Sequence, residues 1–212
     1  MAEQYLAFDL GAESGRAMAA AFDGDRLTLE EVHRFPNGPV CVPLAAGLAE
    51  APKEALYWDA LALWRDLKAG MAAFQERYGA PASIGIDAWG VDYALLGADG
   101  SLLGNPYNHR DPRTNGMLEE AFWRVPKDVI FERTGIQFMP INTLYQLLAS
   151  VLHGSPTLAA ATTFLTMPDL FAFWLTGRAA CEFTNATTSK AFDPREHGWA
   201  NALLDRRAIP SV

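Results

Sequence analysis

Cysteine is nearly absent from this 212-residue sequence, which contains only Cys41 and Cys181. The two are far apart and stand in no spacing typical of a metal site, which argues against a disulfide framework and a structural zinc centre. We therefore expect two free, reduced thiols in a cytoplasmic protein.

Positive charge is also scarce. Lys and Arg number 17 against 25 Asp and Glu, a net charge of −8, and no basic stripe occurs along the chain. Nucleic acid binding needs clustered Lys and Arg to contact phosphates, so we expect no nucleic acid partner.

Long apolar runs are missing as well. The longest candidate, over residues 164–175, is interrupted by Pro168 and Asp169, and the N-terminus lacks the basic region of a signal peptide. These features predict no membrane partner. The length suits about one globular domain.

The first part of the chain has the pattern of three antiparallel strands. An apolar run over residues 5–10 is followed by a glycine-containing turn and a second run over 16–22. Asp23-Gly24-Asp25 then separates it from a third run over 26–35, which predicts a hairpin. Residues 36–57 contain four prolines and predict a long irregular connection.

Helical periodicity begins after Trp58. Apolar residues recur every three or four positions up to Tyr78, and Asp59 is placed to cap this helix. We expect a strand at 84–86 and a hairpin over 91–103 around Asp99-Gly100. Further helices are expected over 114–124, 127–134, 143–153 and 168–176. Three antiparallel strands followed by helix, strand and helices indicate an α/β fold with a mixed sheet.

The glycine turn after the first strand excludes two common nucleotide-binding folds. A dinucleotide-binding loop leads directly into a helix, whereas a strand and a hairpin follow here. The P-loop is excluded because no Gly-Lys-Ser/Thr occurs. What remains is the ribonuclease-H-like or actin-like arrangement, in which a hairpin between the first two strands surrounds the phosphates.

The first candidate site is this turn, from Asp9 to Arg16. A carboxylate at the end of a buried strand needs a cation or donors, and hydrated magnesium is a natural partner beside phosphates. Gly11 and Gly15 would allow close backbone approach to phosphate oxygens, while Ser14 and Arg16 would add a hydroxyl and a positive charge. The alternative is an ordinary tight hairpin.

The second candidate follows the strand at 84–86. Asp87, Trp89, Gly90 and Asp92 stand together there, and carboxylates and aromatic faces are typical of sugar sites. A side chain at position 90 would block close approach of a sugar to the strand end. The alternative is a strand with a core tryptophan and two solvated acids.

Two further segments are rich in polar side chains. Residues 107–114 form a loop containing His109, which suits a binding group but also an ordinary surface histidine. Asn142 and Thr143 precede an apolar helix, and we expect them to cap it.

Seven strings carry a resemblance that covers nearly the whole chain except residues 36–57. They are DLGAESGR (9–16), EEVHRFPNG (30–38), IGIDAWGVDYALLGADG (84–100), HRDPRTNGM (109–117), TGIQFMPINTLYQL (134–147), MPDLFAFWLTG (167–177) and EFTNATTS (182–189). In this order they resemble the FGGY family of carbohydrate kinases, and within it the rhamnulokinases. The strings WGVDY, GIQFMPINTLYQL and EFTNATTS are the most specific.

The resemblance implies a ribonuclease-H-like (actin-like ATPase) domain with a mixed five-stranded sheet flanked by helices. Residues 1–212 would be the family's N-terminal domain, incomplete at its C-terminal end and without the second domain. The activity implied is phosphorylation of the terminal hydroxyl of L-rhamnulose by magnesium-ATP, giving L-rhamnulose 1-phosphate.

The resemblance also implies roles for single residues. Asp9 would hold magnesium through water, and the backbone and side chains of the turn would hold the ATP phosphates; these turn residues are Gly11, Ala12, Glu13, Ser14, Gly15 and Arg16. Gly90 would contact the sugar, with Asp87, Trp89 and His109 as neighbours.

The sequence departs from the family pattern in three places. Glu13 stands where a hydroxyl residue is common, and His109 where an aromatic residue is expected. The general base, an Asp in a His-Asp pair, is expected beyond residue 212, so the chain alone should show no turnover. Two alternatives stay open: another FGGY ketose kinase acting on a sugar such as L-fuculose, and a non-catalytic actin-like module that binds nucleotide or sugar.

Overall fold

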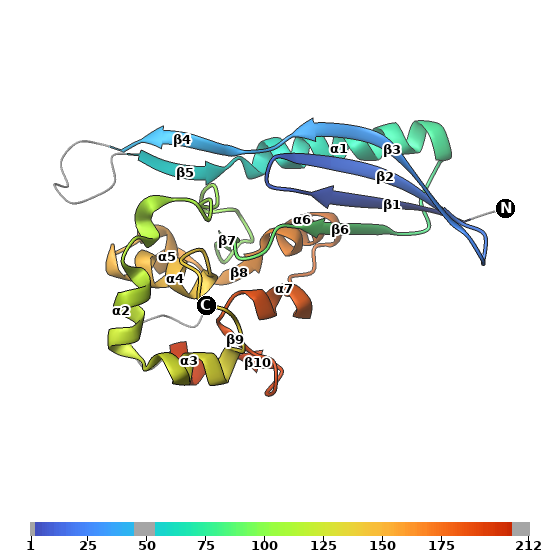
Figure 1. The fold of residues 1–212 in the computed structure, drawn as a ribbon. Coiled ribbons are helices and arrows are strands. Elements are labelled where there is room, and N and C mark those ends of the chain that lie inside the picture. The colour runs from blue at the N-terminus through green and yellow to red at the C-terminus, as the bar shows by residue number, and fades with distance from the viewer. Residues whose placement is uncertain (1–2, 45–53, 205–212) are drawn as a thin grey trace.

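The computed structural model describes residues 3–44 and 54–204 (Figure 1). Its main sheet has the strand order β3-β2-β1-β6. The strands β1 (Glu3–Leu10), β2 (Ser14–Phe22) and β3 (Leu27–Pro36) form an antiparallel meander, and β6 (Ile84–Ala88) adds to β1 in parallel. The predicted mixed sheet, with a turn between its first two strands, is therefore confirmed.

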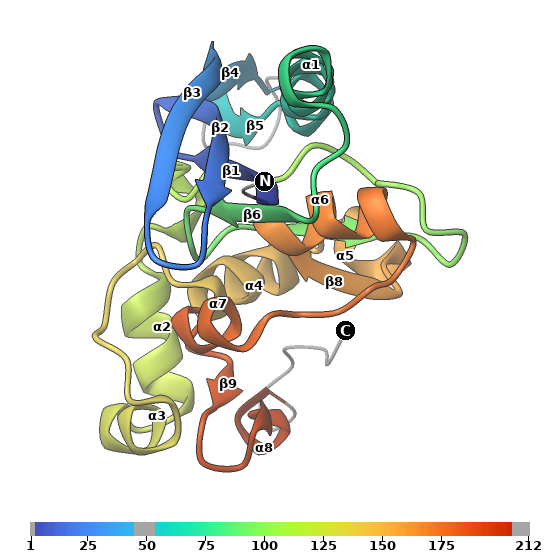
Figure 2. The same ribbon diagram turned by 90° about the vertical axis from the view of Figure 1, so that its right-hand side faces the viewer.

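One face of the sheet is covered by helix α1 (Ala60–Tyr78) and by α6 (Met167–Thr176), which lie on the same side in Figure 2. The carboxylate of Asp59 accepts a hydrogen bond from the Ala62 N–H at 3.0 Å, which confirms the predicted cap. The helix α1 lies so close to the sheet at Gly70 that a Cβ there would lie 2.8 Å from the Ala17 Cβ.

The residues shared between this face and the two helices form one buried cluster. It contains Leu6, Phe8, Leu10, Ala17, Ala19, Val32, Phe35, Leu63, Leu67, Phe74, Met167 and Phe171. Because side chains alternate along a strand, the residues between these point to the opposite face of the sheet. That face is not covered by either helix.

The remaining helices build a second cluster around α4 (Thr143–Leu152). The helices α2 (Met117–Arg124) and α3 (Lys127–Thr134) are confirmed close to their predicted bounds, as are α4 and α6. Gly177 ends α6 with φ 72°, as its position predicts. Short elements that the sequence did not predict complete this part: η1 (Pro112–Thr114), α5 (Pro156–Ala160), β8 (Thr163–Thr166), α7 (Phe183–Thr188), β9 (Phe192–Asp193), β10 (Gly198–Trp199) and α8 (Asn201–Leu204).

Residues 36–57 differ from the prediction. In place of an irregular connection, the described part forms an antiparallel ribbon of β4 (Pro39–Pro43) and β5 (Glu54–Trp58); residues 45–53 lie outside the described part. Proline is tolerated at the ends of an edge strand, where β4 has it, so the prolines did not exclude a strand. The fully buried Trp58 anchors the ribbon.

The predicted hairpin over 91–103 is only partly correct. The strand β7 (Tyr93–Leu96) reaches Leu102 by one isolated bridge, and its main partner is β8, antiparallel and about 70 residues later. This pair is separate from the main sheet, which among the described residues has four strands, one fewer than the expected five.

Both cysteines are free, as expected, and burial raises the pKa of the Cys181 thiol to about 12. Among the described residues, no helix has both the length and the apolar character needed to cross a bilayer.

Candidate functional site

Four charged side chains form a row across the uncovered face of the main sheet. The register pairs Arg34 of β3 with Arg16 of β2, Arg16 with Asp9 of β1, and Asp9 with Asp87 of β6. The row therefore has two guanidinium groups on one side and two carboxylates on the other. The carboxylates stand near the carboxyl ends of parallel neighbouring strands, where α/β sheets bind ligands.

Asp9 has a cationic partner in the structure, as a carboxylate at a strand end requires. The Arg16 guanidinium donates to its Oδ2, and this pair is half-exposed, with 42% of the Arg16 and 46% of the Asp9 side chain accessible. Asp9 Oδ1 has no hydrogen-bond partner in the described part of the chain. One carboxylate oxygen thus remains free to bind a further group.

The turn after β1 is closed by its own backbone. Gly11 N–H donates to Ser14 O at 2.9 Å, and Asn37 fastens the turn to the start of the next segment by donating from Nδ2 to Gly11 O at 2.7 Å and from its N–H to Glu13 O at 3.0 Å. The N–H groups of Ala12 and Glu13 have no partner among residues 3–44 and 54–204. Two backbone donors are therefore available to an anion.

The two glycines of the turn have different roles. Gly11 lies where the turn closes, and a Cβ there would lie 3.1 Å from Ser14 O. At Gly15 a Cβ would lie 2.2 Å from the Phe35 ring. Gly15 faces the core and provides space for an aromatic side chain. The sequence had instead indicated that Gly15 allows close approach to phosphate. Its side of the strand explains this difference, because Arg16 and not Gly15 points to the open face.

Two more charged residues lie at the turn, Arg34 beside it on β3 and Glu13 within it. Arg34 forms an ion pair with Glu31 at 2.6 Å and lies 3.5 Å from Ser14 Oγ. Glu13 is exposed, and within the described residues its carboxylate makes no hydrogen bond or ion pair. The turn is therefore bordered by positive charge, with Glu13 directed to solvent.

A pocket of about 630 Å³ lies at the outer edge of β6, between this strand and the helices α6 and α7. Its wall includes Asp87 and Gly90, two of the predicted sugar-site residues. A Cβ at Gly90 would lie 3.0 Å from Thr188 Oγ1 and 3.7 Å from Asn185 Oδ1, so the missing side chain leaves room beside polar groups of α7. Both α7 residues also line the pocket, and the sequence motif EFTNATTS contains them.

Trp89 and His109 do not line this pocket; a third residue, Asp92, brings them together. Asp92 is fully buried, and its Oδ2 accepts hydrogen bonds from Trp89 Nε1 at 3.0 Å and Trp58 Nε1 at 2.6 Å. The same oxygen is hydrogen-bonded to His109 Nδ1 at 2.8 Å. The Trp58 and Trp89 rings lie 4.1 Å apart. Asp92 is therefore a structural centre and not the solvated acid that the sequence offered as an alternative.

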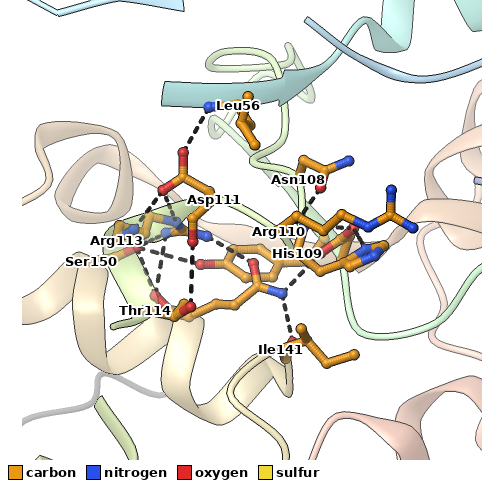
Figure 3. Close-up of polar contacts among 12 residues, drawn as sticks. Leu56, Asn108, His109, Arg110, Asp111, Arg113, Thr114, Ile141 and Ser150 are labelled. Atoms are coloured by element: carbon orange, nitrogen blue, oxygen red, sulfur yellow. Dashed lines mark hydrogen bonds and ion pairs between the residues drawn. The ribbon is translucent and has the colours of Figure 1, made fainter. Parts of the chain in front are cut away.

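A second buried charge continues this network. Arg113 donates to Gln146 Oε1 at 2.8 Å and to Ser150 Oγ at 2.9 Å, and Gln146 Nε2 donates to Asp92 Oδ1 at 2.8 Å. Asp111 accepts from Leu56 N–H at 2.7 Å and so ties the loop to β5. Figure 3 shows His109 and Arg113 at opposite ends of this row of contacts.

The expected cap of α4 is wrong in its chemistry. Asn142 occupies the N-cap position, but its Oδ1 accepts from Met139 N–H at 2.9 Å, and Thr143 Oγ1 donates to Val91 O at 2.7 Å. Asn142 Nδ2 also donates to Thr188 O at 3.5 Å, so both side chains join segments that are far apart in sequence. Sequence reasoning also gave no role to Asn37, Gln146 or Asn185, because their partners lie 26 to 95 positions away or in a pocket.

The comparisons agree with this arrangement. The model of the FGGY family of carbohydrate kinases, N-terminal domain, matches residues 4–212. A curated protein named rhamnulokinase, from Pectobacterium carotovorum subsp. carotovorum (strain PC1), is 41% identical over 207 residues, which are 97% of this chain and 40% of that protein. The chain thus spans about 40% of the length of the curated relatives it matches.

Solved structures share the fold at low identity. A ligand-bound xylulose kinase from Lactobacillus acidophilus superimposes with a TM-score of 0.80 at 18% identity, covering 99% of this chain and 40% of that one. A Plasmodium falciparum glycerol kinase solved with ADP gives a TM-score of 0.72 at 16% identity, covering 96% of this chain and 40% of that one. These likenesses show the fold and confirm the actin-like architecture.

Proposed function

The chain belongs to the FGGY family of carbohydrate kinases, and from this membership we propose that it takes part in phosphoryl transfer from magnesium-ATP to the terminal hydroxyl of L-rhamnulose. The product is L-rhamnulose 1-phosphate. The observation that carries the proposal is the row on the open face of the sheet. This row joins the turn after β1 to two carboxylates, one of which, Asp87, lines the pocket beside β6, and the chain is 41% identical to a rhamnulokinase.

The phosphate end of the site is supported by its donors. The unpartnered N–H groups of Ala12 and Glu13, the Ser14 hydroxyl and the guanidinium of Arg16 all suit phosphate oxygens. Glu13 itself is exposed, so its carboxylate does not have to lie against the phosphates.

Magnesium fits the carboxylates of the row. Asp9 and Asp87 offer hard oxygen ligands in register on adjacent strands, and the free Oδ1 of half-exposed Asp9 suits contact through a water molecule. Bound magnesium would neutralise charge on the transferred phosphate. Asp9 would hold the metal, and Arg16, which donates to Asp9 Oδ2, would keep that carboxylate in place.

The sugar end is the pocket beside β6. Gly90 leaves space next to the polar groups of Thr188 and Asn185, and Asp87 supplies an acceptor for sugar hydroxyls. We expect the chain to bind L-rhamnulose in this pocket.

Calorimetric titration of the chain with ketoses tests the proposal. L-rhamnulose should bind saturably, and Gly90→Val should abolish binding because the added side chain would meet Thr188. Stronger binding of L-fuculose would instead favour the second ketose kinase activity. Binding of nucleotide with no ketose would favour the non-catalytic module.

A further inference from the structure

Asp92 is fully buried, and its side chain accepts four hydrogen bonds whose direction is fixed by the donor. Oδ2 accepts from the two tryptophan indoles and from the His109 N–H, and Oδ1 accepts from Gln146 Nε2. An indole nitrogen, a backbone N–H and an amide nitrogen can only donate. Four donors match the acceptor sites of a carboxylate without a proton, so this geometry favours an acceptor role for Asp92 toward His109 Nδ1, 2.8 Å away, as well.

The orientation of the Gln146 amide is fixed independently. Its Nε2 also donates to Ile141 O at 2.9 Å, and its Oε1 accepts from Arg113 at 2.8 Å, so oxygen and nitrogen cannot be exchanged. The donors thus run in one direction, from buried Arg113 through Gln146 to Asp92. Hydrogen bonds aligned in this way strengthen one another and stabilise the charge at Asp92.

The proton of His109 follows from this arrangement. Because Asp92 only accepts, Nδ1 at 2.8 Å carries the hydrogen. In the neutral ring Nε2 is then an acceptor. Nε2 has no hydrogen-bond partner in the described part of the chain, and the ring is 13% exposed.

We infer that Asp92 is a positioning residue that holds His109 in the Nδ1–H tautomer, so that Nε2 accepts a hydrogen bond from one hydroxyl group of the sugar. The inference rests on the proposed function for the identity of the ligand. It places His109 beside the pocket and not in its wall: Trp89 shares Oδ2 of Asp92 with His109, and Trp89 directly precedes Gly90, which lines the pocket. A purely structural role would not need the charge, because burying a carboxylate is costly and a neutral side chain would fill the space at lower cost.

The tautomer is measured directly in the 212-residue chain. The sequence has four histidines, so ¹⁵N-labelled histidine gives few signals, and His109→Asn assigns the one of interest. At neutral pH His109 should show a protonated Nδ1 and an unprotonated Nε2. A protonated Nε2, or signals averaged between the two tautomers, would overturn the inference.

Variants separate positioning from stability. Asp92→Asn should give averaged tautomer signals and weaken L-rhamnulose binding roughly tenfold, about the effect of one lost hydrogen bond. Asp193→Asn is the matched control, since Asp193 is also buried and accepts from Arg195 N–H at 3.0 Å in another part of the fold. It should leave the His109 signals unchanged. If Asp92→Asn does not fold, the wild-type spectrum still decides.

The contact with sugar has its own readout. Saturation with L-rhamnulose should shift the His109 Nε2 signal and leave those of His33, His153 and His197 in place. His109→Asn keeps a donor for Asp92 but removes Nε2, and should bind roughly tenfold more weakly. Binding that leaves Nε2 unshifted would refute the contact. If no ketose binds, the proposed function and the sugar contact both fail. The tautomer measurement then still tests whether Asp92 positions His109.

Discussion

Asp9 and Asp87 occupy the same register position on two parallel strands, so that their carboxylates extend side by side from the open face of the sheet. Of the two, Asp9 is paired with an arginine, Arg16, and Asp87 has no such partner within residues 3–44 and 54–204. Two neighbouring carboxylates repel each other, and the guanidinium offsets only part of that charge. A divalent cation would offset the rest, which connects the geometry of the sheet edge to magnesium.

Replacing Asp9 should change nucleotide binding in a specific way. Asp9→Asn removes one negative charge beside the phosphates and frees Arg16, so metal-free ADP should bind as well as before or better. The gain in affinity that magnesium gives the wild type should fall by roughly tenfold, or about 1.4 kcal/mol. Titration calorimetry with and without magnesium measures both. Asp25→Asn, in the exposed hairpin turn, is the control and should change neither affinity. If Asp9→Asn lowers the affinity for ADP as much without magnesium as with it, the assignment of Asp9 to magnesium is wrong.

Gly15 should be required for stability and not for phosphate contact. An alanine there would place its Cβ 2.2 Å from the Phe35 ring, and such overpacking costs roughly 1–3 kcal/mol of unfolding free energy. Urea unfolding of Gly15→Ala measures the loss. Adding Phe35→Leu, which shortens the clashing side chain, should recover part of it. Gly85→Ala is a matched control in β6, because nothing lies within 4 Å of its added Cβ. Unchanged stability of Gly15→Ala would show that the ring moves freely.

Predictions from the sequence succeeded where the interacting residues are close together in the chain and failed where they are far apart. The turn between Asp9 and Arg16 and the cap at Asp59 are local, so spacing and residue type were sufficient to predict them. The pairing of β7 with β8 depends on residues about 70 positions apart, and the bond from Gln146 to Asp92 on residues 54 apart. No local pattern specifies such partners. The sequence therefore indicated Trp89, Asp92 and His109 as candidates, but not that Asp92 is buried and joins the other two.

Lys190 should make stability depend on pH. Its side chain is buried, Nζ donates to Ile136 O at 2.5 Å, and burial lowers its pKa from 10.5 to about 8. A lowered pKa means that the folded state disfavours the charged form, so the penalty is fully present below pH 8 and disappears as pH rises from about 8 to 10.5. The unfolding free energy should therefore rise over this window, by about 1–3 kcal/mol.

Comparison with Lys190→Met isolates this contribution. Both proteins share every other titrating group, including Tyr145, whose pKa burial raises, so the difference between them cancels those effects. Urea unfolding at pH 7.5 and 9.5 should show a steeper increase for the wild type than for the variant. Parallel pH profiles would mean that Lys190 is solvated in solution.

The outer edge of β6 should make the isolated chain associate. The strand is at the end of the sheet order, its outer edge has no strand partner among the described residues, and Ile84 is 39% exposed there. An exposed edge with apolar side chains pairs readily with another chain, and a lysine on such an edge prevents this. We therefore expect Ile84→Lys to show less concentration-dependent association than the wild type in sedimentation velocity, without a loss of stability, because the side chain is already partly in water. Leu61→Lys, on the exposed side of α1 at 62% exposure, is the control for charge alone. If both variants reduce association equally, net charge and not the strand edge is responsible.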